Sequence, residues 1–151
     1  MAEPGARAGA DVLTDRLGYL LKHVQARLAE ESARTLEPFG ITGRELAVLA
    51  VLGESRPISQ LEGAGRLGVD RTTMVGLVDR LERRGLVERR RSEQDRRKNV
   101  VALTEDGADL LRRAEDARRG MERAFLAPLG DSEAERFVRS LRLLLNDGGS
   151  R

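Results

Sequence analysis

The middle of the chain constrains the fold most, because two helical patterns are followed directly by two strand patterns. A short apolar-periodic segment at 59–67 ends at Gly68, and a second helical pattern follows at 70–84. Glycine in the turn between two short helices is typical of a steep crossing, where the backbone often needs a left-handed conformation. Strand-like stretches at 86–91 and 99–104 come next, joined by a long polar loop. We therefore predict a helix-turn-helix with a β-hairpin beside it.

Helical patterns flank this region on both sides. Residues 11–36 carry one apolar stripe made of Leu13, Leu17, Leu20, Leu21, Val24 and Leu28. Thr42 and Glu45 have the spacing of a capping box, which opens an apolar helix that ends near Leu52. Thr104 caps a helix to about Ala127, and a last helix begins at Asp131 or Ser132. Long stripes of this kind need partner helices to cover them.

These patterns define a mainly α fold with a small β-hairpin wing. Aromatic residues make up only 3% of the chain, so the core consists of Leu, Val and Ala, which favours helices packed on helices. We expect a disordered lead-in at 1–10 and a winged helix-turn-helix lobe at 37–104. Residues 11–36 together with 105–146 are expected to form a helical dimerisation region.

Basic side chains concentrate in residues 80–98. This segment holds nine basic and four acidic residues, a balance of +5, whereas the whole chain carries +2 and the remainder therefore −3. A basic block on a mildly acidic body is typical of a protein that binds a polyanion such as nucleic acid. The alternative is a solvated, charged face.

The second helix of the motif, at 70–84, has two distinct faces. Met74, Val78 and Leu81 share the apolar face, and the opposite face offers Arg71, Thr72, Thr73 and Gly76 near the start of the helix. Hydroxyl and guanidinium groups there suit contacts to base edges and phosphates in a major groove. We assign direct readout to Arg71, Thr72 and Thr73, and phosphate contact to Arg80. An ordinary surface helix remains the alternative.

The hairpin loop at 92–98 is too charged to pack internally. An arginine-bearing loop beside a recognition helix is placed to enter the adjacent minor groove, where narrow A·T tracts strengthen the negative potential. The candidate contacts at and beside this loop are Arg91, Arg96, Arg97 and Lys98. Asp95 carries the same sign as phosphate, so we expect it to be an internal brace that orients an arginine.

These residues give the chain a resemblance to the MarR family of bacterial transcription regulators. The likeness is carried by 67–70, 72–82, 84–89 and the wing signature Asp95-Arg96-Arg97 followed by 101–104, and it extends from about Asp11 to Leu145. It implies a triangular homodimer whose terminal helices intertwine, with one winged lobe on each half-site of double-stranded DNA. It also implies that Arg97 is the wing-tip arginine and Asp95 its partner.

The family implies a repressor that a small, often aromatic and anionic ligand releases from a pseudo-palindromic operator. Candidate ligand residues are Arg16, Tyr19 and His23, spaced i, i+3 and i+7 on the first long helix. A guanidinium, a phenol and an imidazole can grip a carboxylated ring. Alternatively, Arg16 and His23 are surface groups and Tyr19 fills a dimer seam.

Two departures from the family pattern fall in the DNA-binding motif. Family members usually carry Leu at Gly63 and a polar residue at Gly65, so we expect a weak first helix in which Leu61 supplies the packing. Gly76 and Val75 also stand where polar or basic base-reading residues are common.

Several function classes are excluded or disfavoured. The chain has no Cys and one His, which excludes disulfides, thiol-based redox sensing and Cys or His-cluster metal sites, so we expect neither metal nor cofactor. No nucleophile–base pair stands out, so we expect no enzyme. Without a signal-peptide core or a long apolar run, the expected compartment is the cytoplasm, with the protein on the nucleoid when DNA-bound and no membrane partner. The competing function is a non-specific architectural DNA-binding protein.

Overall fold

The computed structural model describes residues 12–54 and 56–148, and the predicted lead-in at 1–10 lies outside them. The elements are α2 (Leu17–Leu36), η1 (Glu37–Phe39), α3 (Gly43–Leu52), α4 (Gln60–Leu67), α5 (Arg71–Arg83), β1 (Val87–Arg91), β2 (Asn99–Leu103), α6 (Glu105–Leu126), η2 (Ala127–Leu129) and α7 (Asp131–Asp147). This order confirms a mainly α fold with one β-hairpin. In the described part of the chain, no helix is both long and apolar enough to cross a membrane.

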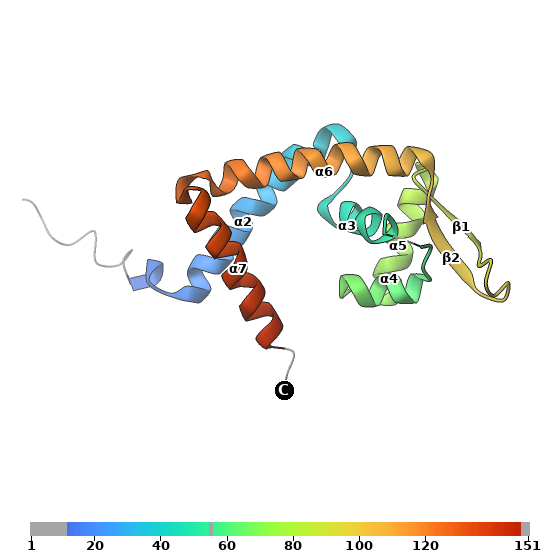
Figure 1. The fold of residues 1–151 in the computed structure, drawn as a ribbon, viewed down its shortest axis with the longest axis horizontal. Helices are drawn as coiled ribbons and strands as arrows, with labels where there is room; N and C mark the ends of the chain where they lie inside the picture. Colours follow the sequence, from blue (N-terminus) through green and yellow to red (C-terminus); the bar gives the residue numbers. More distant parts are fainter. Residues whose placement is uncertain (1–11, 55, 149–151) are drawn as a thin grey trace, which may run out of the picture.

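The long helix α6 connects two regions of the molecule (Figure 1). Helices α3, α4 and α5 and the β1–β2 hairpin gather at the start of α6, and the hairpin projects outward from them. At the other end of α6 the chain turns at η2 into α7, and α2 runs alongside α6. The hairpin therefore lies far from α7.

Side-chain caps fix where the lobe's helices begin. Thr42 and Glu45 form both hydrogen bonds of the predicted capping box, and Asp70 and Thr104 each accept a backbone N–H at the start of α5 and α6. Gly68 adopts a left-handed conformation with φ of 67° between α4 and α5, as the turn requires. The local sequence thus determines where α5 begins and how the chain turns from α4 into it.

The first long helix is interrupted near its predicted start, because residues 12–14 are helical but α2 begins only at Leu17. Arg16 is the N-cap of α2, with an extended backbone at φ −90° and ψ 125°. The amide of Arg16 donates to the carbonyl of Leu13, which closes a turn before α2 begins. The leucine spacing continues across this break, so periodicity alone did not reveal it. Arg16 therefore does not share a continuous helix with Tyr19 and His23.

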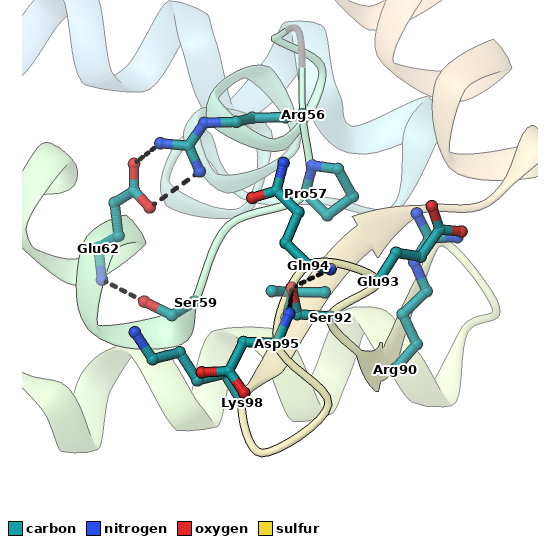
Figure 2. Close-up of a pocket in the computed structure, with 11 residues that line it drawn as sticks. Arg56, Pro57, Ser59, Glu62, Arg90, Ser92, Glu93, Gln94, Asp95 and Lys98 are labelled. Atoms are coloured by element: carbon teal, nitrogen blue, oxygen red, sulfur yellow. Dashed lines mark hydrogen bonds and ion pairs between the residues drawn. The ribbon is translucent and has the colours of Figure 1, made fainter.

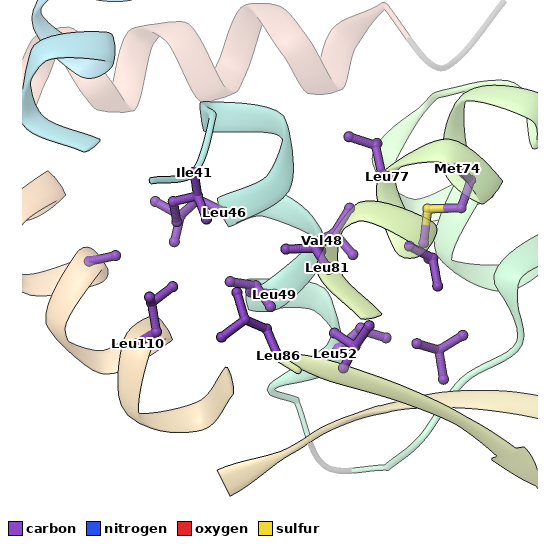
Figure 3. Packing of buried hydrophobic residues seen from close by; sticks show 14 of the residues in the cluster. Ile41, Leu46, Val48, Leu49, Leu52, Met74, Leu77, Leu81, Leu86 and Leu110 are labelled. Atoms are coloured by element: carbon purple, nitrogen blue, oxygen red, sulfur yellow. The ribbon is translucent and has the colours of Figure 1, made fainter. Parts of the chain in front are cut away.

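The core of the lobe is a single cluster of apolar side chains, with the largest shares from α3 and α5 and others from α2, α4, both strands and α6 (Figure 3). Four of its side chains, Val48, Leu49, Val78 and Leu81, have no exposed surface. This cluster fixes the inward face of α5 and leaves the opposite face of that helix outside.

Helix α4 packs against this core in a way that the sequence did not predict. Leu61 is 72% exposed, so the expectation that it supplies the packing is wrong. The inward positions are instead Gly63 and Ala64, and a Cβ at Gly63 would lie only 2.6 Å from the Cε of Met74. The glycine therefore lets α4 approach α5 closely, which compensates for its low helix propensity.

Candidate nucleic-acid interface

The start of α5 presents its polar side chains outward. The carboxylate of Asp70 accepts the backbone N–H of Thr73 at 2.6 Å, and the hydrogen bonds from Thr73 hold the pKa of Asp70 below its ordinary value. Arg71 and Thr72 are exposed, whereas Thr73 and Gly76 are half-buried. Met74, Leu77, Val78 and Leu81 hold the opposite face in the core.

Arg80, predicted as a phosphate contact, is partly engaged within the protein. Its Nε donates to Oε1 of Glu45 at 3.0 Å, and the other oxygen of that nearly buried carboxylate closes the capping box of α3. Arg84, one turn later, donates to the carbonyl oxygens of Gly40 and Phe39. Arg80 therefore holds α5 to the start of α3, and Arg84 holds the end of α5 to the segment that joins α2 to α3.

The wing is an antiparallel hairpin whose base is tied to the lobe. Its register places Arg91 opposite Asn99, and Ile58 exchanges two backbone hydrogen bonds with Val101. In the loop, the amide of Ser92 donates to the carbonyl of Lys98 at 2.8 Å. Arg91, Arg96, Arg97 and Lys98 are all exposed, and no ion pair to them is formed within the described residues.

Asp95 braces the loop through its backbone. Its Oδ1 accepts the main-chain N–H of Arg97 at 3.1 Å, and its carbonyl accepts the N–H of Lys98 at 3.0 Å. The brace thus acts on the chain at Arg97 rather than on the guanidinium, which remains exposed. This arrangement fixes the direction in which the loop presents its arginines.

Arg89 was counted in the basic block at 80–98, but its side chain is engaged within the lobe. Its half-buried side chain donates to Gln60 of α4 and to Asp79 and Glu82 of α5. A signal for this was present in the sequence, because Val87 is an inward strand residue and alternation turns Arg89 to the same face. Partial burial opposes its charge, but the hydrogen bonds that Arg89 donates to Asp79 and Glu82 outweigh that effect and raise the pKa of Arg89.

A hollow of about 330 Å³ lies between the wing loop and the segment that leads into α4 (Figure 2). Arg56 forms an ion pair with Glu62 on one side of it, at 2.9 Å. The charged side chains that line it are Arg56, Arg90, Lys98, Glu62, Glu93 and Asp95. Because basic and acidic groups are equal in number, this hollow favours neither an anion nor a cation.

The predicted ligand residues lie far along the chain from the wing, at the start of α2. The rings of Tyr19 and His23 are in contact, with centroids 4.0 Å apart and planes tilted by 41°. Arg16 stands outside the helix as its N-cap. Within the described residues, no group of three or more His, Cys, Asp or Glu side chains is arranged to hold a metal ion.

Comparison with known proteins gives a consistent result. Residues 41–98 match the profile of the MarR family. The HTH-type transcriptional repressor Rv2887 of Mycobacterium tuberculosis is 34% identical over 131 residues, which cover 87% of this chain and 94% of the repressor.

Two solved structures of the repressor CouR are also similar. The complex of CouR with a 23-mer DNA duplex has a TM-score of 0.76 at 33% identity, covering 92% of this chain and 95% of that one. CouR from Rhodococcus jostii RHA1 bound to p-coumaroyl-CoA has a TM-score of 0.77 at 30% identity, covering 87% and 93%.

Proposed function

The chain belongs to the MarR family of DNA-binding transcriptional regulators, and from this premise we propose that it is a homodimeric repressor with a small-molecule inducer. Each winged lobe binds one half of a pseudo-palindromic operator, and ligand binding changes the spacing of the lobes and lowers affinity. Because its operator is chromosomal DNA, we propose that the protein acts in the cytoplasm and lies on the nucleoid while it is bound. The relatives to which it is similar are regulators, and we propose no enzymatic activity.

The observation that carries the proposal is the shared exposure of α5 and the wing. Arg71 and Thr72 at the start of α5 and Arg96 and Arg97 in the wing loop are all exposed on one lobe. We assign Arg71, Thr72, Thr73 and the position of Gly76 to the major groove, and the wing to the adjacent minor groove. CouR, with the same fold, is a repressor that binds a DNA duplex.

Exposed apolar side chains support the homodimer. Among the described residues, every large apolar side chain that is exposed, except Leu61, lies within 12–24 or 129–145. No residue of α7 is buried, although Phe137, Leu141, Leu144 and Leu145 form a stripe along it. A helix with an uncovered apolar stripe needs a partner, and a second copy supplies the same stripe.

For the inducer we propose an aromatic acid or its thioester. Tyr19 and His23 offer two rings at the start of α2, and Arg16, the N-cap of that helix, offers a cation three residues before Tyr19. CouR, at 30% identity, binds p-coumaroyl-CoA, which combines an aromatic ring with anionic groups.

The proposal is tested by selecting binding sites from a library of random DNA duplexes. We expect a pseudo-palindrome with half-site centres about 10 base pairs apart, preferred over bulk DNA by roughly 10³-fold or more. Enrichment without a shared sequence would favour the architectural alternative and contradict the repressor.

The dimer is tested by sedimentation of Leu144→Glu with Leu61→Glu as the matched control. Both leucines are more than two-thirds exposed in the protomer, at 71% and 72%, so neither change disturbs its core. We expect Leu144→Glu alone to yield monomers and to lose operator binding. Equal dimerisation of both variants would contradict the proposed interface.

A further inference from the structure

Arg89 lies inside the basic block but points into the lobe. Its Nη1 donates to Oε1 of Glu82 at 2.7 Å and its Nη2 to Oδ1 of Asp79 at 2.6 Å. Nε and Nη2 donate to Oε1 of Gln60 at 3.1 and 2.9 Å, and the backbone N–H donates to Glu82 at 3.1 Å. The side chain of Arg89 is only 29% exposed.

These contacts join three elements at one point. Gln60 is the first residue of α4, Asp79 and Glu82 lie on α5, and Arg89 is the central residue of β1. The wing loop projects from the far end of the same strand, so the direction of the wing relative to α5 depends on how β1 is held. We call Arg89, Gln60, Asp79 and Glu82 the wing clamp.

The wing clamp is poorly suited to bind phosphate itself. All three guanidinium nitrogens of Arg89 already donate to protein acceptors. Two carboxylates against one guanidinium leave the cluster with a charge of −1, which repels DNA.

We infer that Arg89 is a positioning residue for DNA binding: it sets the wing against α5 so that both reach one duplex, without touching the DNA. The inference depends on the proposed use of α5 and the wing. It also assigns a role to Asp79, an acidic residue on the helix that faces DNA.

Replacing Asp79 distinguishes a positioning role of the wing clamp from a purely electrostatic effect on DNA binding. Asp79→Ala deletes a negative charge from the DNA-binding lobe, so Coulomb attraction alone predicts tighter binding. The wing clamp predicts weaker binding by about tenfold, the equivalent of one lost hydrogen bond between charged groups.

A spin label on the wing reports the positioning without DNA. The chain has no cysteine, so Gln94→Cys gives a single labelling site at the exposed wing tip. We expect greater mobility of this label when Asp79→Ala or Arg89→Met is added. In a separate series that carries the label at Arg44→Cys on α3 instead, the same two substitutions should leave its mobility unchanged.

Arg90→Met is the matched control, because alternation turns Arg90 to the other face of β1, where its nearest carboxylate is Glu88 at 3.7 Å. It should leave wing mobility unchanged. Arg89→Lys, whose ammonium can satisfy one carboxylate, should be intermediate in mobility and affinity and keeps the test available if Arg89→Met does not fold.

The two readouts distinguish failure of the inference from failure of the proposed function. Unchanged wing mobility in Asp79→Ala and Arg89→Met, or tighter DNA binding by Asp79→Ala, would overturn the wing clamp alone. Increased mobility with full affinity would overturn the positioning role together with the proposed contact between wing and DNA.

Discussion

The salt dependence of operator binding counts the cations that contact phosphate, and the structure fixes how many are free to do so. Of the nine basic residues at 80–98, five are engaged within the protein: Arg80, Arg83, Arg84, Arg89 and Arg90. The other four and Arg71 are exposed and form no ion pair within the described residues, which gives five free cations on the α5 and wing surface of each lobe.

This count sets the expected slope. At about −0.9 per neutralised phosphate, five cations give a slope of log affinity against log salt of about −4.5 for one lobe and about −9 for a dimer. If every basic residue of the block and Arg71 contacted DNA, the slope for a dimer would be about −18. The structure therefore predicts half the salt dependence that the charge of the sequence suggests.

Arg97→Ala should flatten the slope by about one unit for each lobe, or about two for a dimer, because one phosphate contact is lost from each. The assay is fluorescence anisotropy of a labelled operator between about 50 and 200 mM salt. Arg90→Ala is the control and should leave the slope unchanged. Arg90 lies on the face of β1 opposite to Arg89, where it pairs with Glu88, and it is not one of the five free cations. A wild-type slope near −18, or an unchanged slope in Arg97→Ala, would refute the reasoning.

Two further predictions concern stability. Gly107→Ala places a Cβ only 1.9 Å from the carbonyl oxygen of Leu86, so overpacking of about 1–3 kcal/mol should outweigh the gain of about 1 kcal/mol in helix propensity. Gly65→Ala, whose Cβ meets nothing within 4 Å, should instead raise the free energy of unfolding in urea, and the opposite ranking would show that α6 does not approach Leu86 so closely. Because the folded pKa of Asp70 lies below 3.8, its carboxylate stabilises the fold above that pH and stops doing so as the pH falls through the lower folded value. Asp70→Asn should therefore be less stable than wild type at neutral pH but equal to it at the acid end of a pH series; a constant difference would contradict this.

Features set by neighbouring residues were predictable from the sequence. The capping box of Thr42 and Glu45, the cap at Asp70 and the left-handed turn at Gly68 each depend on atoms within a few residues. The exposed wing loop was predictable too, because so many charges cannot be buried without partners.

Features set by distant residues were not. Whether Gly63 or Leu61 faces the core depends on the position of Met74 on another helix, and apolar character alone favoured the leucine. The charge of Arg89 and Arg80 counted toward DNA binding in the sequence, but carboxylates from other elements engage both side chains. Net charge over a segment thus measures attraction to DNA only after internal ion pairs are removed.

Tethered cleavage tests most directly whether α5 and the wing meet neighbouring grooves of one duplex. An iron chelate that generates hydroxyl radicals is attached to a single cysteine, at Gln94→Cys in the wing or Thr72→Cys on α5, and cleavage of a selected operator is mapped. We predict that the wing probe cuts in the minor groove flanking each half-site, with the α5 probe cutting inside the half-site between those positions. Cleavage by the wing probe that is absent, or spread evenly along the duplex, would contradict the account.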